Sequence, residues 1–204
     1  MKYFRADLHV HSRFSRATSG RLNIRNLAAW SMIKGLSVMS TGDFTHPAWR
    51  ADLRRDLVYD DNSGLYRVRE KTPLETEIPG FSRPEGVSEP QFLIQAEISS
   101  IYKKDGSVRK VHNVVIMPSL ESADKLSNKL AAIGNITSDG RPILGLDCEH
   151  LLEMVLEADE RGVLIPAHIW TPWFSLFGSK SGFDALEDCF GSLSSHIFAL
   201  ETGL

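Results

Sequence analysis

ADLHVHSRFSRATSG, residues 6–20, follows the charged start of the chain and runs into hydroxyls and arginines. Successive side chains of a β-strand point to opposite faces, so His9 and His11 project on the same side. Two imidazoles placed in this way are typical ligands of a metal ion. The stretch therefore predicts a strand over residues 3–10 that brings two metal ligands to its carboxyl end.

Strand and helix patterns alternate along the rest of the chain. Asn23 is a suitable N-cap and Gly35 a stop for a helix over residues 24–34, and Pro47 suits the start of the next helix. Further helices are predicted over 48–59, 119–134, 148–162 and 183–193. Strands are predicted over 36–43, 91–102, 109–118, 163–170 and 196–203. The polar, proline-rich stretch 60–89 is predicted to be an inserted loop, and Asp105-Gly106 predicts a hairpin turn.

This alternation predicts a mostly parallel α/β fold, either barrel-like or doubly wound, in which functional residues gather at the carboxyl ends of the strands. Uncommon polar residues fall at those positions. They are His9, His11, Asp43, His46, Glu97, His112, His168 and Glu201. One layer of the fold is expected to hold them all.

Composition excludes several classes of protein. The 204 residues are 42% hydrophobic, which suits one domain with a sizeable core. The formal charge of -3 does not indicate a general nucleic-acid binder, so such contacts would need local patches. With only two cysteines, the sequence does not predict a thiolate zinc site or a disulfide framework. It lacks an apolar run of bilayer length, and we expect a cytoplasmic protein without membrane contact.

Imidazole and carboxylate ligands suit zinc, manganese or iron. Glu97 is the one acid at the end of an otherwise uncharged strand, and a cation would offset the cost of burying it. We therefore interpret Glu97 as a ligand that bridges two metals. His112 or His168 taken alone is more often a structural histidine, but five of the seven histidines fall at strand ends. His150 and His196 are interpreted as structural or surface residues.

Three further residues are candidates for the site, and two of them, Asp7 and Asp43, have a structural alternative. Asp7 either ends its strand or orients a ligand from the second shell. Asp43 either caps the following helix or binds metal, and its position after a buried strand favours binding. His46 is a weaker ligand candidate than His9.

The first loop and an aromatic segment are candidates for substrate binding. Arg13, Arg16 and Arg21 either form a solvated loop or hold phosphate oxygens beside the metals. Trp170 and Trp173 follow His168, and they either pack in the core or stack on a base or sugar. The basic residues Arg50, Arg54, Arg55, Lys103, Lys104, Arg109 and Lys110 are interpreted as solvated faces.

The ordered motifs DLHVHS, STGDFTHP, AEISSIY, HNVV and PAHIW resemble those of the polymerase and histidinol phosphatase (PHP) superfamily. The resemblance covers essentially the whole chain. It implies a distorted barrel of seven β/α units that holds two or three divalent metals and hydrolyses phosphoesters. The implied ligands are His9, His11, Glu97, His112 and His168, with Asp43 and His46 as further candidates. Zinc is favoured, with manganese or iron as alternatives.

Within that superfamily, ADLHVHSRFSRATS, STGDFTHPAW, PAHIWTPWFSLFGSKSGFD and ALETGL resemble the endonuclease Q family of DNA repair enzymes. That likeness implies a partner, damaged DNA, and cleavage of the phosphodiester 5′ of deaminated bases or abasic sites. Catalytic roles are expected for Glu97, His168 and Arg16. The alternatives are a phosphatase acting on a small phosphomonoester and a metal-binding scaffold without catalysis.

The sequence departs from the PHP pattern twice. Phe44 follows Asp43 where many relatives have a histidine, so His46 would have to substitute. The closing Asp-x-His motif is missing after LETGL, which predicts a hydrolase domain over residues 1–204 with a barrel incomplete at its C-terminal end. The chain is then expected to lack the C-terminal region of a longer parent, and to bind metal incompletely or cleave poorly by itself.

Overall fold

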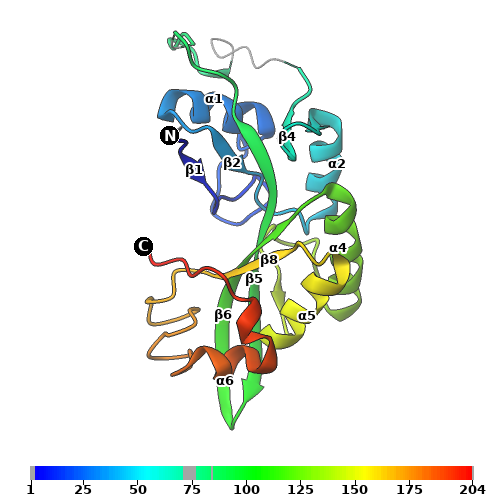
Figure 1. Ribbon diagram of the computed structural model, residues 1–204, viewed down its shortest axis with the longest axis vertical. Coiled ribbons are helices and arrows are strands. Elements are labelled where there is room, and N and C mark those ends of the chain that lie inside the picture. Colours follow the sequence, from blue (N-terminus) through cyan, green and yellow to red (C-terminus); the bar gives the residue numbers. More distant parts are fainter. Residues whose placement is uncertain (1–2, 71–76, 84, 204) are drawn as a thin grey trace.

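The computed structural model describes residues 3–70, 77–83 and 85–203, whose strands form one open sheet of eight (Figure 1). The strands are β1 (Ala6–Asp7), β2 (Val38–Ser40), β3 (Leu57–Asp60), β4 (Leu65–Val68), β5 (Gln91–Lys104), β6 (Ser107–Met117), β7 (Ile143–Leu144) and β8 (Val163–Pro166). The helices are α1 (Ile24–Lys34), α2 (Pro47–Asp56), α4 (Leu120–Ile133), α5 (Cys148–Ala158), α6 (Leu186–Phe190) and the 3-10 helix η1 (Gly191–His196). The predicted α/β class is thus confirmed.

The sheet is mixed rather than mostly parallel. β1, β2 and the start of β5 are parallel neighbours, whereas β4 pairs antiparallel with β5, and β3 with β4. β5 and β6 form a long antiparallel hairpin, with β8 antiparallel to β6 and the short β7 parallel to β5. Among the described residues the expected barrel is not seen, because these strands do not close onto one another.

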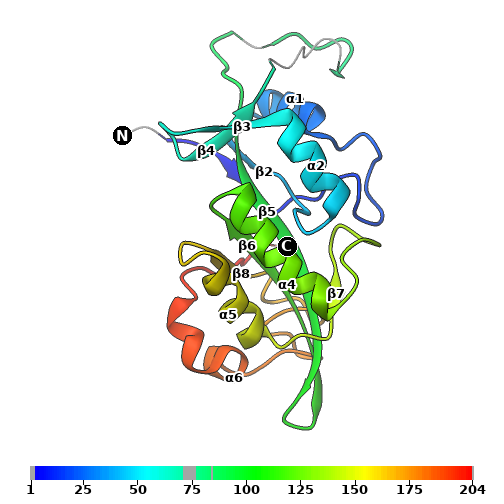
Figure 2. The same cartoon turned by 90° about the vertical axis from the view of Figure 1, so that its right-hand side faces the viewer.

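The long strand β5 separates an apolar layer from a polar one. Its side chains Phe92, Ile94 and Ile98 are fully or almost fully buried in the main core. Helices α2, α4 and α5 cover one side of the sheet (Figure 2). The alternate residues of the strand are also buried, yet they include Gln95, Glu97 and Ser99. Strands that are buried on both faces are usually apolar on both, so the buried polar side chains of β5 indicate a functional site.

Local signals explain most of the predicted elements. Asn23 caps α1 by accepting the Asn26 N–H at 2.9 Å, and Gly35 ends that helix at φ 68°. Asp105 and Gly106 take φ values of 53° and 74°, as a tight hairpin turn requires. The helices predicted at 24–34, 119–134 and 148–162 are thereby confirmed, with ends that differ by up to four residues.

Two predicted elements were wrong. The helix expected to reach residue 59 ends at Asp56, because Leu57–Asp60 pair with Leu65–Val68 in a hairpin inside the expected loop. Residues 71–76 and 84 of that loop lie outside the described part. The strand expected over 196–203 is absent, although Glu201 exchanges backbone hydrogen bonds with Pro166 and Ile169. Such isolated bonds hold the segment beside β8 without making a ladder.

No helix in the described part of the chain is long and apolar enough to cross a membrane. Cys148 and Cys189 are both buried and both free thiols.

Candidate metal centre

Two of the candidate ligands come from the β5–β6 hairpin. Glu97 faces Val114 across the ladder, and Ser99 faces His112. Directly opposed residues in an antiparallel pair share a face, so Glu97 and His112 are diagonal neighbours on one face of the sheet. The hairpin register alone therefore brings these two side chains together.

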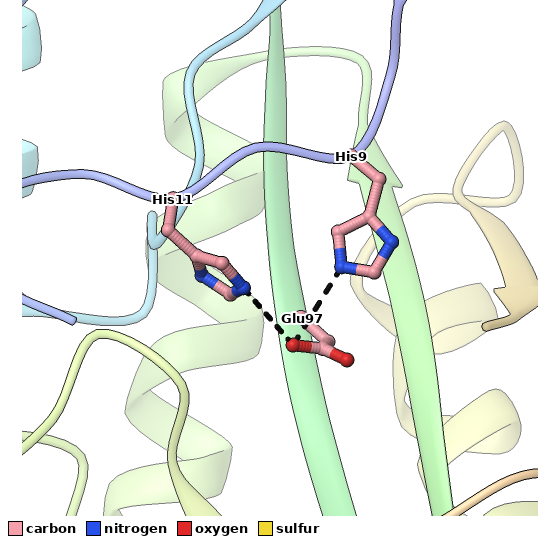
Figure 3. Close-up of side chains that lie close together, drawn as sticks. All are labelled: His9, His11 and Glu97. Atoms are coloured by element: carbon pink, nitrogen blue, oxygen red, sulfur yellow. Dashed lines mark ion pairs between the residues drawn. The ribbon is translucent and has the colours of Figure 1, made fainter. Parts of the chain in front are cut away.

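The other three histidines arrive from loops at strand ends. His9 and His11 lie beyond β1, and both rings point at Glu97 (Figure 3). This segment was expected to belong to the strand itself. His168 lies two residues beyond β8 with φ 32°, an uncommon value for a residue other than glycine. That turn directs its imidazole back toward the sheet.

The carboxylate of Glu97 is shared between two pairs of imidazoles. Its Oε2 lies 3.1 Å from His11 Nε2 and 3.6 Å from His9 Nε2. Its Oε1 lies 2.7 Å from His112 Nδ1 and 3.3 Å from His168 Nε2. Two groups of potential metal ligands result, His9–His11–Glu97 and Glu97–His112–His168. Each oxygen of one buried carboxylate thus serves one group.

The donors fit divalent ions. Two ligand atoms bound tetrahedrally to zinc, each about 2.1 Å from it, lie about 3.4 Å apart, which is close to the separations at Glu97. Among the described residues, the buried His112 Nδ1 makes no hydrogen bond of standard geometry, although it lies 2.7 Å from Glu97 Oε1. Two close polar atoms that do not hydrogen-bond are the arrangement expected of ligands to one ion. Buried atoms of Gln95 and Ser99, next to Glu97 on β5, also lack partners among the described residues.

The protonation of these groups follows from their contacts. Burial by itself lowers the pKa of His9, but the carboxylates of Glu201 and Glu97 raise it to about 10. Burial likewise opposes the rise of the His11 pKa to about 9, which its contacts with Asp43 and Glu97 produce. Burial raises the pKa of Glu97, yet the surrounding imidazoles hold it far below its usual range. The centre therefore keeps an ionised carboxylate in its middle, as a cation-binding site requires.

Two carboxylates orient the histidine pair. Asp43 lies 2.9 Å from His11 Nδ1 and accepts hydrogen bonds from the Ser12 N–H and hydroxyl, both at 2.6 Å. Glu201 lies 2.9 Å from His9 Nδ1 and accepts the His168 N–H at 2.7 Å. In both histidines the Nδ1 atom is engaged in this way and the Nε2 atom faces Glu97. Carboxylates that hold the far side of a metal-binding imidazole commonly fix its tautomer and direction.

The loop that carries Asp43 requires a close backbone approach. Gly42 has φ 67°, and a Cβ there would lie 2.7 Å from the Val10 carbonyl oxygen. Asp43 itself has φ 50°. Trp49 is fully buried and donates from Nε1 to the Gly42 carbonyl at 2.8 Å, which secures this turn against α2.

Two predicted site residues lie apart from the ligand groups. The Nε2 atom of His46 lies 3.0 Å from the Thr137 carbonyl, and its ring stacks on Phe14 at 4.3 Å between centroids. Burial lowers the pKa of His46. Asp7 accepts a long 3.4 Å hydrogen bond from the His9 N–H, so it touches the ligand segment through the backbone.

The three arginines of the first loop differ in their partners. Arg13 pairs with Asp52 at 2.6 Å, and Arg21 donates to the Glu77 carbonyl at 3.1 Å. Arg16 is 77% exposed and pairs with Asp139 at 3.3 Å. Arg16 thereby contacts the loop 137–141, which borders the centre through Arg141.

The two predicted tryptophans are exposed rather than packed in the core. Trp170 is 60% and Trp173 50% exposed. Trp170 lies against Phe177, with ring centroids 5.5 Å apart. Both follow His168 in the loop beside the centre.

The sequence interpretation missed Arg141. Its Nη1 lies 3.2 Å from Glu97 Oε2, so a guanidinium adjoins the presumptive ligands. Arg141 belongs to a loop without a periodic pattern, and nothing local in the sequence marks it. In the sequence analysis, Glu201 was counted among the strand-end residues but not among the site residues. A carboxylate in the otherwise apolar stretch HIFALETG could have indicated its role.

The fold resembles solved structures of endonuclease Q. Endonuclease Q of Pyrococcus furiosus, described as a lesion-specific endonuclease, matches 98% of this chain with a TM-score of 0.75 and 31% identity. A complex of endonuclease Q with a 27-mer duplex that has an abasic lesion at the active site matches equally well. The expected resemblance to endonuclease Q is thus confirmed.

The similarity concerns a part of these larger proteins. This chain spans 42% of the endonuclease Q chain. The protein MJ0043 of Methanocaldococcus jannaschii is 29% identical over 183 residues, which are 89% of this chain and 18% of that protein. No protein-family model matches the sequence.

Proposed function

We propose that residues 1–204 form the metal-dependent hydrolase domain of a DNA repair endonuclease that cleaves the phosphodiester 5′ of deaminated bases or abasic sites. The observation that carries the proposal is the buried Glu97 carboxylate, each oxygen of which faces one pair of histidines. Two divalent ions side by side are a common device for phosphodiester hydrolysis. The likeness to endonuclease Q supports DNA as the substrate.

His9, His11 and Glu97 would hold one ion, and Glu97, His112 and His168 the other. Zinc suits these ligands best, with manganese or iron as alternatives. Bound there, the ions would polarise a phosphoryl oxygen and lower the pKa of a water molecule. Asp43 and Glu201 would keep the Nε2 atoms of His11 and His9 directed at the centre.

Cationic side chains beside the centre would position the phosphate. Arg141 lies against Glu97 and is 38% exposed, so its guanidinium can reach a bound phosphodiester as well as the carboxylate. Arg16 is exposed on the neighbouring loop and would contact a flanking phosphate. Guanidinium groups suit phosphate oxygens because they donate two parallel hydrogen bonds.

The test is a cleavage assay of the full-length protein that contains residues 1–204, on matched duplexes. The duplexes contain one deoxyuridine, one deoxyinosine, one abasic site or no lesion, and zinc or manganese is supplied. We expect nicks at the lesions only, with new ends 5′ of the damaged nucleotide and loss of activity in a chelator. Glu97→Gln is the matched inactive control, since it keeps the side-chain volume and removes the charge.

Two results would reject the repair assignment. Equal cutting of all four duplexes would indicate a nuclease without lesion specificity. No cutting, together with turnover of p-nitrophenyl phosphate, would indicate a phosphatase for small phosphomonoesters.

A further inference from the structure

A group of cations on the β5–β6 hairpin and the neighbouring loop 171–184 lacks acidic partners. Elsewhere in the described chain most arginines and lysines lie within 4.0 Å of a carboxylate, as Arg13 does with Asp52. Within the described residues, the same contact is absent for Lys103, Arg109, Lys110 and Lys180. These four residues and Trp173 are called the hairpin surface below. The two segments carry five cations against three acids, Glu97, Asp105 and Asp184. The fifth cation, Lys104, lies 3.9 Å from Asp147 and Glu149 and is therefore left out of the hairpin surface.

Aromatic rings hold two of these cations in place. Lys110 Nζ lies 5.2 Å from the Trp173 ring centroid and 5.4 Å from that of Phe174. Arg109 lies over Phe183 at 4.3 Å and donates to the Gly182 carbonyl. Such contacts restrain a cationic side chain without neutralising its charge. The cations therefore remain available to an anionic partner.

The loop and the hairpin also enclose a pocket. Arg109 and Lys180 are among its lining residues, with Ser107, Ser179 and Asp184, and its volume is about 220 Å³. Lys180 and Ser179 are exposed. Hydrogen-bond donors thus outnumber the single acid that lines this pocket, an arrangement that suits a phosphate group.

The hairpin surface adjoins the metal centre through Lys110 and the loop 171–184. Lys110 and His112 are two residues apart in β6 and therefore share a face. The Phe174 ring contacts both, since its centroid lies 4.8 Å from that of His112. The backbone N–H of His112 donates to the Phe174 carbonyl at 3.0 Å, and that of Lys110 to the Ser181 carbonyl at 3.1 Å. The loop is thereby attached along the edge of β6.

The hairpin extends far enough from the centre to follow several nucleotides. Its turn forms the lower tip of the molecule (Figures 1 and 2). From His112 to Gly106 the strand covers about 20 Å, at about 3.3 Å per residue. One DNA strand carries a phosphate about every 3.4 Å along the helix axis, so roughly six phosphates match this length.

We propose that the hairpin surface binds the phosphate backbone of DNA beside the cleavage site, with the exposed face of Trp173 stacked on a base. This inference rests on the function proposed above. It assigns a role to Lys103, Arg109 and Lys110, which the sequence analysis interpreted as a solvated face, and it combines them with Lys180 and with Trp173, already a candidate for stacking on a base. Unneutralised cations beside an exposed aromatic ring are the combination that nucleic acids require. An acidic protein would also bind the cations, but it would not account for the exposed ring of Trp173.

The test measures binding without cleavage. Fluorescence anisotropy with a labelled abasic-site duplex is recorded in a chelator over a series of salt concentrations. The triple variant Arg109→Gln, Lys110→Gln, Lys180→Gln is compared with a control triple variant, Arg5→Gln, Lys34→Gln, Arg67→Gln. The control removes the same charge from cations that also lack a carboxylate within 4.0 Å among the described residues. These cations lie elsewhere, just before β1, at the end of α1 and in β4.

We expect the plot of log affinity against log salt to become less steep by about 2 to 3 in the hairpin variant, because each phosphate contact contributes about 0.9. The control variant should keep the wild-type slope. Trp173→Ala should weaken binding roughly tenfold at unchanged slope, since stacking is not an ionic interaction.

Equal slope changes in both triple variants, or none in the hairpin variant, would overturn the inference. Binding of polyglutamate as tight as that of DNA, and lost in the hairpin variant, would assign the surface to an acidic protein instead. If the wild type cuts only at lesions but the hairpin variant keeps the wild-type salt slope, the DNA-binding role of the hairpin surface is rejected and the proposed function stands. If the hairpin variant has a less steep salt slope but the wild type does not cut DNA, the proposed function is rejected and the DNA-binding role of the hairpin surface stands.

Discussion

Asp43 lies 2.9 Å from His11 Nδ1 and is fully buried, while the Nε2 atom of the same imidazole faces Glu97 at 3.1 Å. These contacts connect three parts of the chain: the loop after β2, the segment after β1 and the middle of β5. A hydrogen bond on one ring nitrogen thus determines what the other can do.

Asp43→Asn tests this orientation. The amide has nearly the same volume but carries no charge, so it holds the His11 ring in one tautomer less strongly. We expect metal affinity to fall about 10- to 100-fold, as for comparable carboxylates behind histidine ligands. A competition titration against a metal-sensitive dye measures the change, and Asp60→Asn, at the end of β3, is the control. Unchanged affinity in Asp43→Asn would show that the contact has no part in metal binding.

Removing one histidine pair at a time tests the sharing of Glu97. His9→Ala with His11→Ala should abolish tight binding at one site, and His112→Ala with His168→Ala at the other. Glu97→Gln should weaken both sites. Plasma emission analysis of the purified variants gives the metal content, and circular dichroism shows whether each variant is folded. The same metal content in the His9/His11 double variant as in the wild type would contradict the site.

Arg141→Ala tests the guanidinium beside Glu97. If Arg141 stabilises charge on the phosphate, its loss should lower kcat about 10²- to 10³-fold at constant metal content. Arg141→Lys should restore part of the rate, because the charge returns without the second donor. The nicking assay at saturating DNA measures kcat. A rise in KM alone would instead assign Arg141 to ground-state binding.

His46 should make stability depend on pH. Burial lowers its pKa in the folded state, so below its ordinary value of 6.5 the unfolded chain binds a proton more readily. The stability that neutral His46 contributes is thus complete above pH 6.5, and it is lost progressively as the pH falls toward the folded pKa. His46→Phe removes this component. Urea unfolding in a chelator at several pH values between 5 and 8 gives both stability curves. We expect their difference to change below pH 6.5, whereas parallel curves would refute this assignment.

Local sequence determined the elements whose signals act over a few residues. The Asn23 and Gly35 caps bound α1, and Asp105-Gly106 closes the β5–β6 hairpin. Strand alternation also placed His9 and His11 on one side before any partner was known. These features depend on backbone conformation and on neighbours in the chain, so the sequence contains them directly.

Long-range pairing decided the rest. The same residues 57–60 that extend a helical pattern pair with Leu65–Val68 instead, and the last predicted strand obtained only isolated hydrogen bonds. Arg141 reaches Glu97, and Glu201 reaches His9, across more than forty and nearly two hundred residues. Such contacts form when tertiary packing closes long loops, and no local pattern encodes which distant side chain will be the partner. The sequence by itself therefore determined which residues are suited to bind metal, and the tertiary structure alone decided how one carboxylate is shared among four imidazoles.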